Sequence, residues 1–282
     1  MYTVVLTLLA LIAFAANSIL CRLALDDGLM DAGSFTAFRL ISGAVVLGLI
    51  FYCRHEQGQK LRMAGSWLAS VLLFTYAVTF SYAYIALDIA TGALILFAAG
   101  QVTLILSAIF LGSRLSLLAW LGLLLACIGF VYLMLPSATT PSWQGFVLMS
   151  LSGVAWGFYT LLGKGSHQPL ADTTSNFMRS IPLVVVLMLL SHEYTHFNGQ
   201  GLLYAMLSGA IASGVGYTIW YMALAKLETI HAAVVQLFVP ILAGVGGIIF
   251  ASEQLAPRLI IAGMVILGGV LLVMQKGAVK KS

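Results

Sequence analysis

Charged side chains are scarce along this chain, and their scarcity excludes a water-soluble fold. Asp, Glu, Lys and Arg make up 8% of the 282 residues, whereas 61% are hydrophobic and the mean hydropathy is +1.06. Soluble domains carry about 25% charged and 45–50% apolar residues. So few charges could not cover the surface of a soluble protein of this size, and lipid must therefore be the solvent for most of the chain.

Motifs for metals, nucleotides and nucleic acids are also missing. The three cysteines, Cys21, Cys53 and Cys127, have neither metal-ligand nor disulfide-framework spacing, so we interpret them as packing residues. The formal charge of +4 comes from scattered Lys and Arg residues, without the basic cluster that nucleic-acid binding needs. The sequence has no G-x-x-x-x-G-K-[ST] loop, which argues against ATP as its energy source. We predict no cofactor, no metal and no nucleic-acid partner.

Ten apolar segments are long enough to cross a bilayer, which takes about 20 mostly apolar residues. The predicted spans are 4–24, 34–52, 67–87, 90–111, 116–135, 143–163, 173–190, 201–225, 230–251 and 257–274. The run 67–111 is broken mainly at Asp88 but is too long for one crossing, so it must hold two helices. The first run has no basic n-region and no A-x-A site, which favours a spanning helix over a cleavable signal.

The charges of the connections alternate between the two sides of the predicted bundle. On one side the connections and the C-terminal end hold nine basic residues: Arg54, Lys60, Arg62, Arg114, Lys164, Lys226, Lys276, Lys280 and Lys281. On the opposite side, Arg258 is the single basic residue. Because basic connections are retained in the cytoplasm, we predict a multi-pass protein of the inner membrane with both termini cytoplasmic.

The two halves of the sequence resemble each other. Residues 13–22 and 155–164 each have an aromatic near the start and a cation at the end, and Leu115–Met134 aligns with Leu255–Met274. Each half contains five spans, an odd number, so the second half enters the membrane from the opposite face. The sequence therefore predicts an all-α membrane protein of two inverted repeats, 1–135 and 136–282, with a site near the midplane between them.

Several of these positions carry a resemblance to a known family. The relevant residues are the cations Arg22 and Lys164, the arginines Arg39 and Arg179, the Tyr-x-Ala-Leu segments at Tyr84 and Tyr221, Pro240, and the turn Ser252-Glu253-Gln254-Leu255. In these features nearly the whole chain resembles the EamA-type ten-helix transporters of the drug/metabolite transporter superfamily. That resemblance implies transport of a small molecule rather than an enzyme.

One turn departs from the family pattern. The family usually shows Gly-Glu-x-Leu after the fourth and ninth helices. The first copy here reads Gly112-Ser113-Arg114-Leu115, with a base and no acid. This departure removes the basis for a carboxylate role at the first turn.

Polar and aromatic side chains inside the spans predict a substrate cavity, because such groups should face the protein interior or water. The substrate-binding candidates are Asn17, Tyr76, Phe80, Tyr84, Gln101, Trp156, Tyr159, Tyr217, Trp220 and His231. Aromatic walls with a few amides and hydroxyls suit a small, partly apolar solute such as an amino acid. Packing or a bilayer-interface position is the alternative for the aromatic residues.

Four cations within or at the ends of spans need partners or access to water: Arg22, Arg39, Lys164 and Arg179. Nearby Asp residues favour structural ion pairs that hold helix ends together. A gate at each mouth, or a clamp for a substrate carboxylate, is the alternative interpretation.

Acidic residues are absent from the middle of the predicted spans. Proton-coupled antiporters usually keep a carboxylate there as a relay. The sequence therefore favours facilitated diffusion or exchange, with proton coupling through His231 as the weaker option.

We predict a secondary transporter that exports a small metabolite, an amino acid or related compound, by alternating access, as a monomer or homodimer. The alternatives are a proton-coupled antiporter, a non-transporting receptor, and an intramembrane enzyme. The enzyme hypothesis depends on one cluster, Asp26-Asp27-Gly28-Leu29-Met30-Asp31, which is loosely similar to an aspartate-rich Mg²⁺–diphosphate site but has different spacing.

Overall fold

The computed structural model describes residues 2–54, 65–136, 140–163, 166, 168–224, 227, 235–274 and 279–281. Within these residues the chain forms ten continuous helices, which confirms the predicted all-α membrane fold. Seven are long and apolar enough to cross a membrane, and three apolar helices are shorter.

The first half contains α1 (Tyr2–Leu25), α2 (Ala32–Arg54), α3 (Trp67–Ala83), α4 (Ile89–Phe110) and α5 (Leu117–Met134). The second half begins with α6 (Trp143–Gly163) and α7 (Pro169–Leu190). One continuous helix follows, formed by α8 (Gly199–Leu207), a π-helical segment (Ser208–Val215) and α9 (Gly216–Leu224). The last two are α11 (Val239–Ala251) and α12 (Pro257–Met274). Short strands β1 (Ser113–Leu115) and β2 (Val279–Lys281) pair antiparallel.

Local chemistry explains several boundaries that differ from the predicted spans. α7 begins at Pro169 rather than 173, because proline suits the first position of a helix, where no N–H is needed. α3 ends at Ala83 rather than 87, with Tyr84 as its C-cap. Ser66 caps the start of α3 by accepting a 3.1 Å hydrogen bond from the Ala69 amide.

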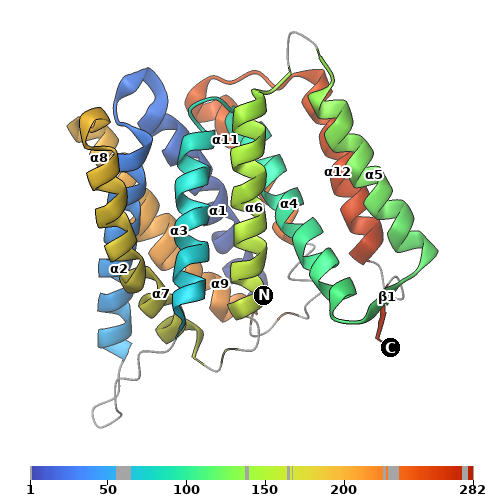
Figure 1. Ribbon diagram of the computed structural model, residues 1–282, viewed down its shortest axis with the longest axis horizontal. Helices are drawn as coiled ribbons and strands as arrows, with labels where there is room; N and C mark the ends of the chain where they lie inside the picture. The colour runs from blue at the N-terminus through green and yellow to red at the C-terminus, as the bar shows by residue number, and fades with distance from the viewer. Residues whose placement is uncertain are drawn as a thin grey trace.

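The packing of the helices stays the same when the two halves are exchanged. α1 packs against α9 and α11, and its counterpart α6 packs against α3 and α4. α2 and α7 are counterparts in the two halves and pack on each other, and the same is true of α5 and α12. Figure 1 shows α5 and α12 side by side at one edge of the bundle, with both chain ends on its lower side.

Residues that lie 140 positions apart in the sequence have equivalent neighbours in the two halves. A Cβ on Gly122 would lie 2.5 Å from the Gly269 carbonyl oxygen, and a Cβ on Gly129 would lie 3.3 Å from that of Ala262. Gly112 and Ser252, which follow α4 and α11, both adopt positive φ, at 92° and 53°. The repeat seen in the sequence is therefore also present in helix packing and helix termination.

We expect Gly269→Ala to destabilise the α5–α12 pair, because the new Cβ would lie 2.5 Å from the Gly122 carbonyl oxygen and 2.7 Å from the Ala126 amide nitrogen. Overpacking of this kind costs about 1–3 kcal/mol. Gly268 is the matched control, since a Cβ there meets nothing within 4 Å. Thermal unfolding of both variants in detergent tests this, and equal losses would contradict the proposed contact.

Candidate substrate site

Seven aromatic side chains from both halves meet inside the bundle. We call this group the central aromatic cluster: Phe14, Tyr76, Trp156, Tyr159, Phe177, Tyr217 and Trp220. Trp156 is its hub, with ring centroids 5.2 Å from Tyr76, 5.8 Å from Tyr159 and 5.6 Å from Tyr217. Phe14 packs edge-on against Tyr217 and Trp220 at 5.9 and 5.7 Å. Five of these seven were predicted as substrate residues, and two more, Phe80 and Asn17, contact the cluster through Tyr76.

A polar network joins the cluster to α1, α2 and the π-helical segment. The Tyr76 hydroxyl accepts hydrogen bonds from Arg39 Nη2 at 2.8 Å and from Asn17 Nδ2 at 3.3 Å. Asn17 Oδ1 in turn accepts one from the Ser208 hydroxyl. Arg39 Nε donates to Ser213 Oγ at 3.5 Å. These contacts hold four helices around one buried guanidinium.

Arg39 lies in a setting that the sequence did not predict. Its side chain is fully buried, and its Cζ lies 5.0 and 4.9 Å from the ring centroids of Tyr76 and Phe80. The favoured interpretation was a structural ion pair, but the ion pairs among the described residues both involve Arg22. The reason is that α2 turns Arg39 toward the cluster, away from the Asp residues that precede the helix.

The π-helical segment lets α2 approach closely beside Arg39. A Cβ on Gly209 would overlap the Arg39 carbonyl oxygen and the Ser42 hydroxyl, so glycine is required there. π-Helical turns occur frequently at functional sites. Here the segment supplies Ser208 and Ser213 to the polar network.

The sides of the bundle are named here by their charges. The basic side is where α2 ends at Arg54 and α3 begins, and the acidic side is where α1 ends and α4 begins near Asp26 and Asp88. Figure 1 has the basic side at the bottom.

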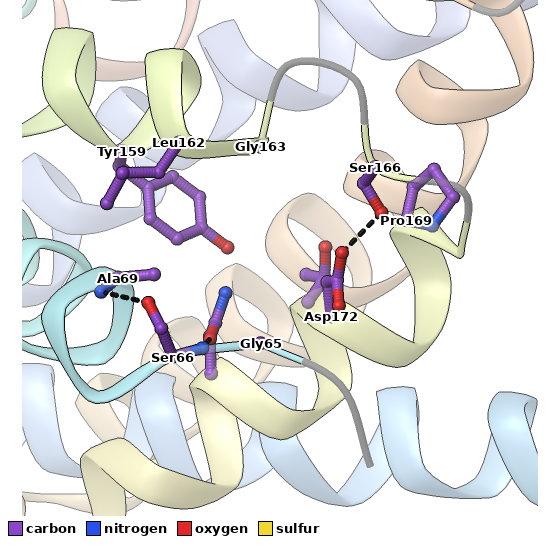
Figure 2. Close-up of a pocket in the computed structure, with 11 residues that line it drawn as sticks. Gly65, Ser66, Ala69, Tyr159, Leu162, Gly163, Ser166, Pro169 and Asp172 are labelled. Carbon is purple, nitrogen blue, oxygen red and sulfur yellow. Dashed lines mark hydrogen bonds between the residues drawn. The ribbon is translucent and has the colours of Figure 1, made fainter. Parts of the chain in front are cut away.

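A cavity of about 160 Å³ opens near the basic side between α3, α6 and α7. It is lined by Gly65, Ser66, Ala69, Tyr159, Leu162, Gly163, Ser166, Pro169, Asp172, Thr173 and Asn176. Figure 2 shows the Tyr159 hydroxyl between the start of α3 and Asp172, which accepts a hydrogen bond from Ser166. Asn176 Oδ1 accepts one from the Ser66 amide at 3.1 Å. The wall is thus partly apolar and carries hydroxyl and amide groups and one acid.

Tyr159 connects this cavity to the buried cluster. Its side chain lines the cavity, and its ring packs on Trp156. Trp156 in turn contacts Tyr76, which holds Arg39. A continuous row of side chains therefore leads from the basic-side cavity to the guanidinium.

Helix ends on the acidic side are joined by contacts centred on Glu253, in the turn between α11 and α12. Both carboxylate oxygens lie 3.0 Å from the amide of Ile89, the first residue of α4, where a helix N-terminus favours negative charge. Arg22 Nε lies 3.8 Å from Glu253 Oε1, Arg22 Nη2 lies 3.6 Å from Asp26, and Nη1 donates to the Tyr84 carbonyl at 3.3 Å. Burial raises the pKa of Glu253, against the opposing effects of the Ile89 amide and Arg22.

A second contact on this side uses an aspartate from the cluster behind the enzyme hypothesis. Asp31 accepts hydrogen bonds from the Ser34 and His196 amides, both at 2.9 Å. Its carboxylate therefore caps α2 and ties it to the connection that precedes α8. Met30 and Phe197 form a backbone bridge beside it.

The other predicted residues lie at the edge of the cluster, apart from it, or outside the described part of the chain. Phe80 lies between Tyr76 and Tyr84, at ring-centroid distances of 5.6 and 4.8 Å, and the Tyr84 hydroxyl donates to the Ile89 carbonyl at 3.3 Å. Gln101 is buried on α4, but the described ring contacts and hydrogen bonds do not join it to the cluster. Arg179 Cζ lies 6.0 Å from the Trp67 ring centroid. Lys164 and His231 fall outside the described residues.

Phe14 and Phe177 were not predicted as site residues, although both contact Tyr217. Helical spacing offers a signal for Phe14, which precedes Asn17 by three residues and so shares its face. A similar signal exists for Phe177, because Thr173, Thr174 and Ser180 lie at helical spacing from it and share its buried face.

Comparisons with known proteins agree with this architecture. A model described as the EamA-like transporter family matches residues 1–135 and again residues 143–275. Uncharacterized protein PA1977 of Pseudomonas aeruginosa is 49% identical over 272 residues, 96% of this chain and 94% of that protein. An uncharacterized transporter of Archaeoglobus fulgidus is 32% identical over 180 residues, 61% of this chain and 63% of that protein.

A solved structure described as "Crystal structure of protein" has a TM-score of 0.63 at 18% identity, over 94% of this chain and 95% of that chain, which supports the fold alone. The ten helices of the described residues and the two matches to a transporter family model define a multi-pass membrane transporter. The chain belongs to the EamA-like transporter family.

Proposed function

We propose that this transporter exports a small metabolite, an amino acid or related compound, by alternating access between repeats 1–135 and 136–282. One observation carries the proposal: a cavity reaches inward from the basic side while Glu253 and Arg22 join helix ends on the acidic side. An arrangement that is accessible from one side and closed on the other is expected of one state of such a cycle.

The size of the cavity supports a small substrate. Its volume of about 160 Å³ is below the roughly 300–1,000 Å³ of sites for drug-sized ligands. Its wall combines hydroxyl, amide and carboxylate groups with the Tyr159 ring. This mixture suits a compound of amino-acid size with polar and apolar parts.

The orientation that we propose supports export. Basic connections belong in the cytoplasm, which places both termini and the cavity mouth on that side of the inner membrane. The cavity begins at Gly65 and Ser66, just after the basic segment that joins α2 to α3. A substrate would therefore load from the cytoplasm.

Counterflow in proteoliposomes tests the proposal. We expect labelled amino acid to exchange against unlabelled amino acid at a rate that an imposed pH gradient does not change. Asp172 is the acid that lines the cavity, so Asp172→Asn is the matched variant for proton coupling. Strict dependence on a proton gradient, lost in Asp172→Asn, would replace exchange with proton-coupled antiport.

A further inference from the structure

We propose that Arg39 binds the carboxylate of the transported substrate, so that the protein selects small carboxylates with an apolar or aromatic remainder. The inference rests on the proposed function and names its substrate class. It depends on the charge, the burial and the free donor of this one side chain.

The charge of Arg39 has no anion beside it among the described residues. Its side chain is 1% exposed, and the described ion pairs leave it out. A guanidinium does not lose its proton in proteins, so burial cannot neutralise it. A buried charge without a partner is costly, and a bound carboxylate would relieve that cost.

The guanidinium is held in a fixed orientation with one donor free. Nη2 donates to Tyr76 and Nε to Ser213, while Nη1 is buried without a hydrogen bond in the described part of the chain. The ring faces of Tyr76 and Phe80 limit its movement further. Charge-assisted hydrogen bonds from arginine to carboxylate are among the strongest in proteins. A preorganised donor of this kind suits recognition better than packing.

Tyr217 provides a second group for the same ligand. Its buried hydroxyl makes no hydrogen bond of good geometry among the described residues, although it interacts with Tyr76, and Tyr217 also interacts electrostatically with Arg39. A carboxylate has two oxygens and could accept from Arg39 Nη1 and from the Tyr217 hydroxyl together. Arg39 Nη1 and the Tyr217 hydroxyl are two buried donors that lack an acceptor, and a bound carboxylate would supply one.

The surroundings determine the rest of the substrate. The rings of Phe14, Trp156 and Tyr217 lie around the polar network, so the remainder of a bound carboxylate would contact aromatic faces. The row from Tyr159 through Trp156 to Tyr76 connects this position with the cavity. Movement of Trp156 would admit the substrate from the basic side.

The test compares matched compounds in proteoliposomes of the full chain. The probes are labelled leucine and phenylalanine, their methyl esters, the corresponding amines without the carboxyl group, and the simple acids phenylpropionate and isocaproate. We expect the compounds with a free carboxylate, which are leucine, phenylalanine, phenylpropionate and isocaproate, to be transported. The methyl esters and the amines should be excluded. Uptake of leucine and phenylalanine without the simple acids would mean that the amino group is read as well, whereas uptake of both would mean that the carboxylate suffices.

The variants separate a binding role from a structural one. We expect Arg39→Gln to raise KM for the transported acids by at least about tenfold, because removing one partner of a buried charge pair usually costs more than this. Arg39→Lys keeps the charge but not the planar fork and should retain partial uptake. Arg54→Gln, an exposed change on the same helix, is the control. Thermal stabilisation by the transported acid should disappear in Arg39→Gln and persist in Arg54→Gln.

The outcomes distinguish this inference from the proposed function. Equal transport of an acid and its methyl ester by the wild-type protein would overturn the role of Arg39 while leaving a transporter, and this result does not depend on whether a variant folds. An unchanged KM in folded Arg39→Gln would overturn it as well. Absence of flux for every probe would overturn the proposed function itself.

Discussion

Gly209→Ala should abolish transport, because the added Cβ would overlap the backbone carbonyl of Arg39 and the Ser42 hydroxyl. A backbone atom cannot move aside as the end of a flexible side chain can, so the π-helical segment and α2 must separate. Overpacking of a tight contact costs about 1–3 kcal/mol. The same displacement would break the hydrogen bond from Arg39 to Ser213.

Gly199→Ala provides the control for this prediction. Gly199 begins the same continuous helix, and a Cβ there meets nothing within 4 Å. Both proteins should insert and purify, and counterflow together with thermal unfolding would compare them. Wild-type transport by Gly209→Ala would show that α2 and the π-helical segment do not need this close approach.

Hydropathy predicted the helices of this protein well, because lipid penalises every polar interruption of a span. The repeat was also visible, since Gly129 and Gly269 are equivalent positions whose neighbours in space are equivalent as well. Helix ends were harder to predict. The cap at Tyr84 and the start at Pro169 depend on a few local contacts that hydropathy does not contain.

The candidate site was predictable in its residue types but not in its arrangement. Asn17, Tyr76, Trp156 and Tyr217 are polar or aromatic residues within spans, and the principle that such groups face inward selected them. The position of Arg39 could not be derived this way. Spacing along α2 gives the face that carries Arg39, but the packing of α2 against α3 and the π-helical segment decides which side chains that face contacts.

The two connections that follow α4 and α11 differ in a way that bears on the closed side. They are equivalent in the repeat, and both begin with a residue at positive φ, Gly112 and Ser252. Where the second has Glu253, the first has Ser113 in the sequence. The carboxylate contact with Arg22 and Ile89 therefore has no acidic equivalent in the first repeat. This asymmetry favours a state that is closed on the acidic side.

Arg22→Met should weaken closure of the acidic side, and neutralising Glu253 should reverse the effect. Arg22 and Glu253 are 24% and 11% exposed, so loss of the pair should cost about 1–2 kcal/mol, between the values for exposed and buried pairs. The double variant Arg22→Met/Glu253→Gln keeps an acceptor for the Ile89 amide without an unpaired carboxylate, and should recover most of this loss. Arg54→Met is the exposed control.

The pH dependence of the same variants gives an independent test. Burial already raises the pKa of Glu253 in the folded protein above that of Glu in the unfolded chain. The stability that Glu253 contributes is therefore present below the unfolded-state pKa and is lost as the pH rises through the folded-state pKa. Removing Arg22 removes an influence that lowers this pKa. Unfolding temperatures of Arg22→Met should therefore approach those of the wild type in acid and fall behind as the pH increases. The double variant should lack this trend, because glutamine does not titrate. A deficit in Arg22→Met that is constant with pH, or one that Glu253→Gln leaves in place, would mean that Arg22 acts through Asp26 or the Tyr84 carbonyl instead.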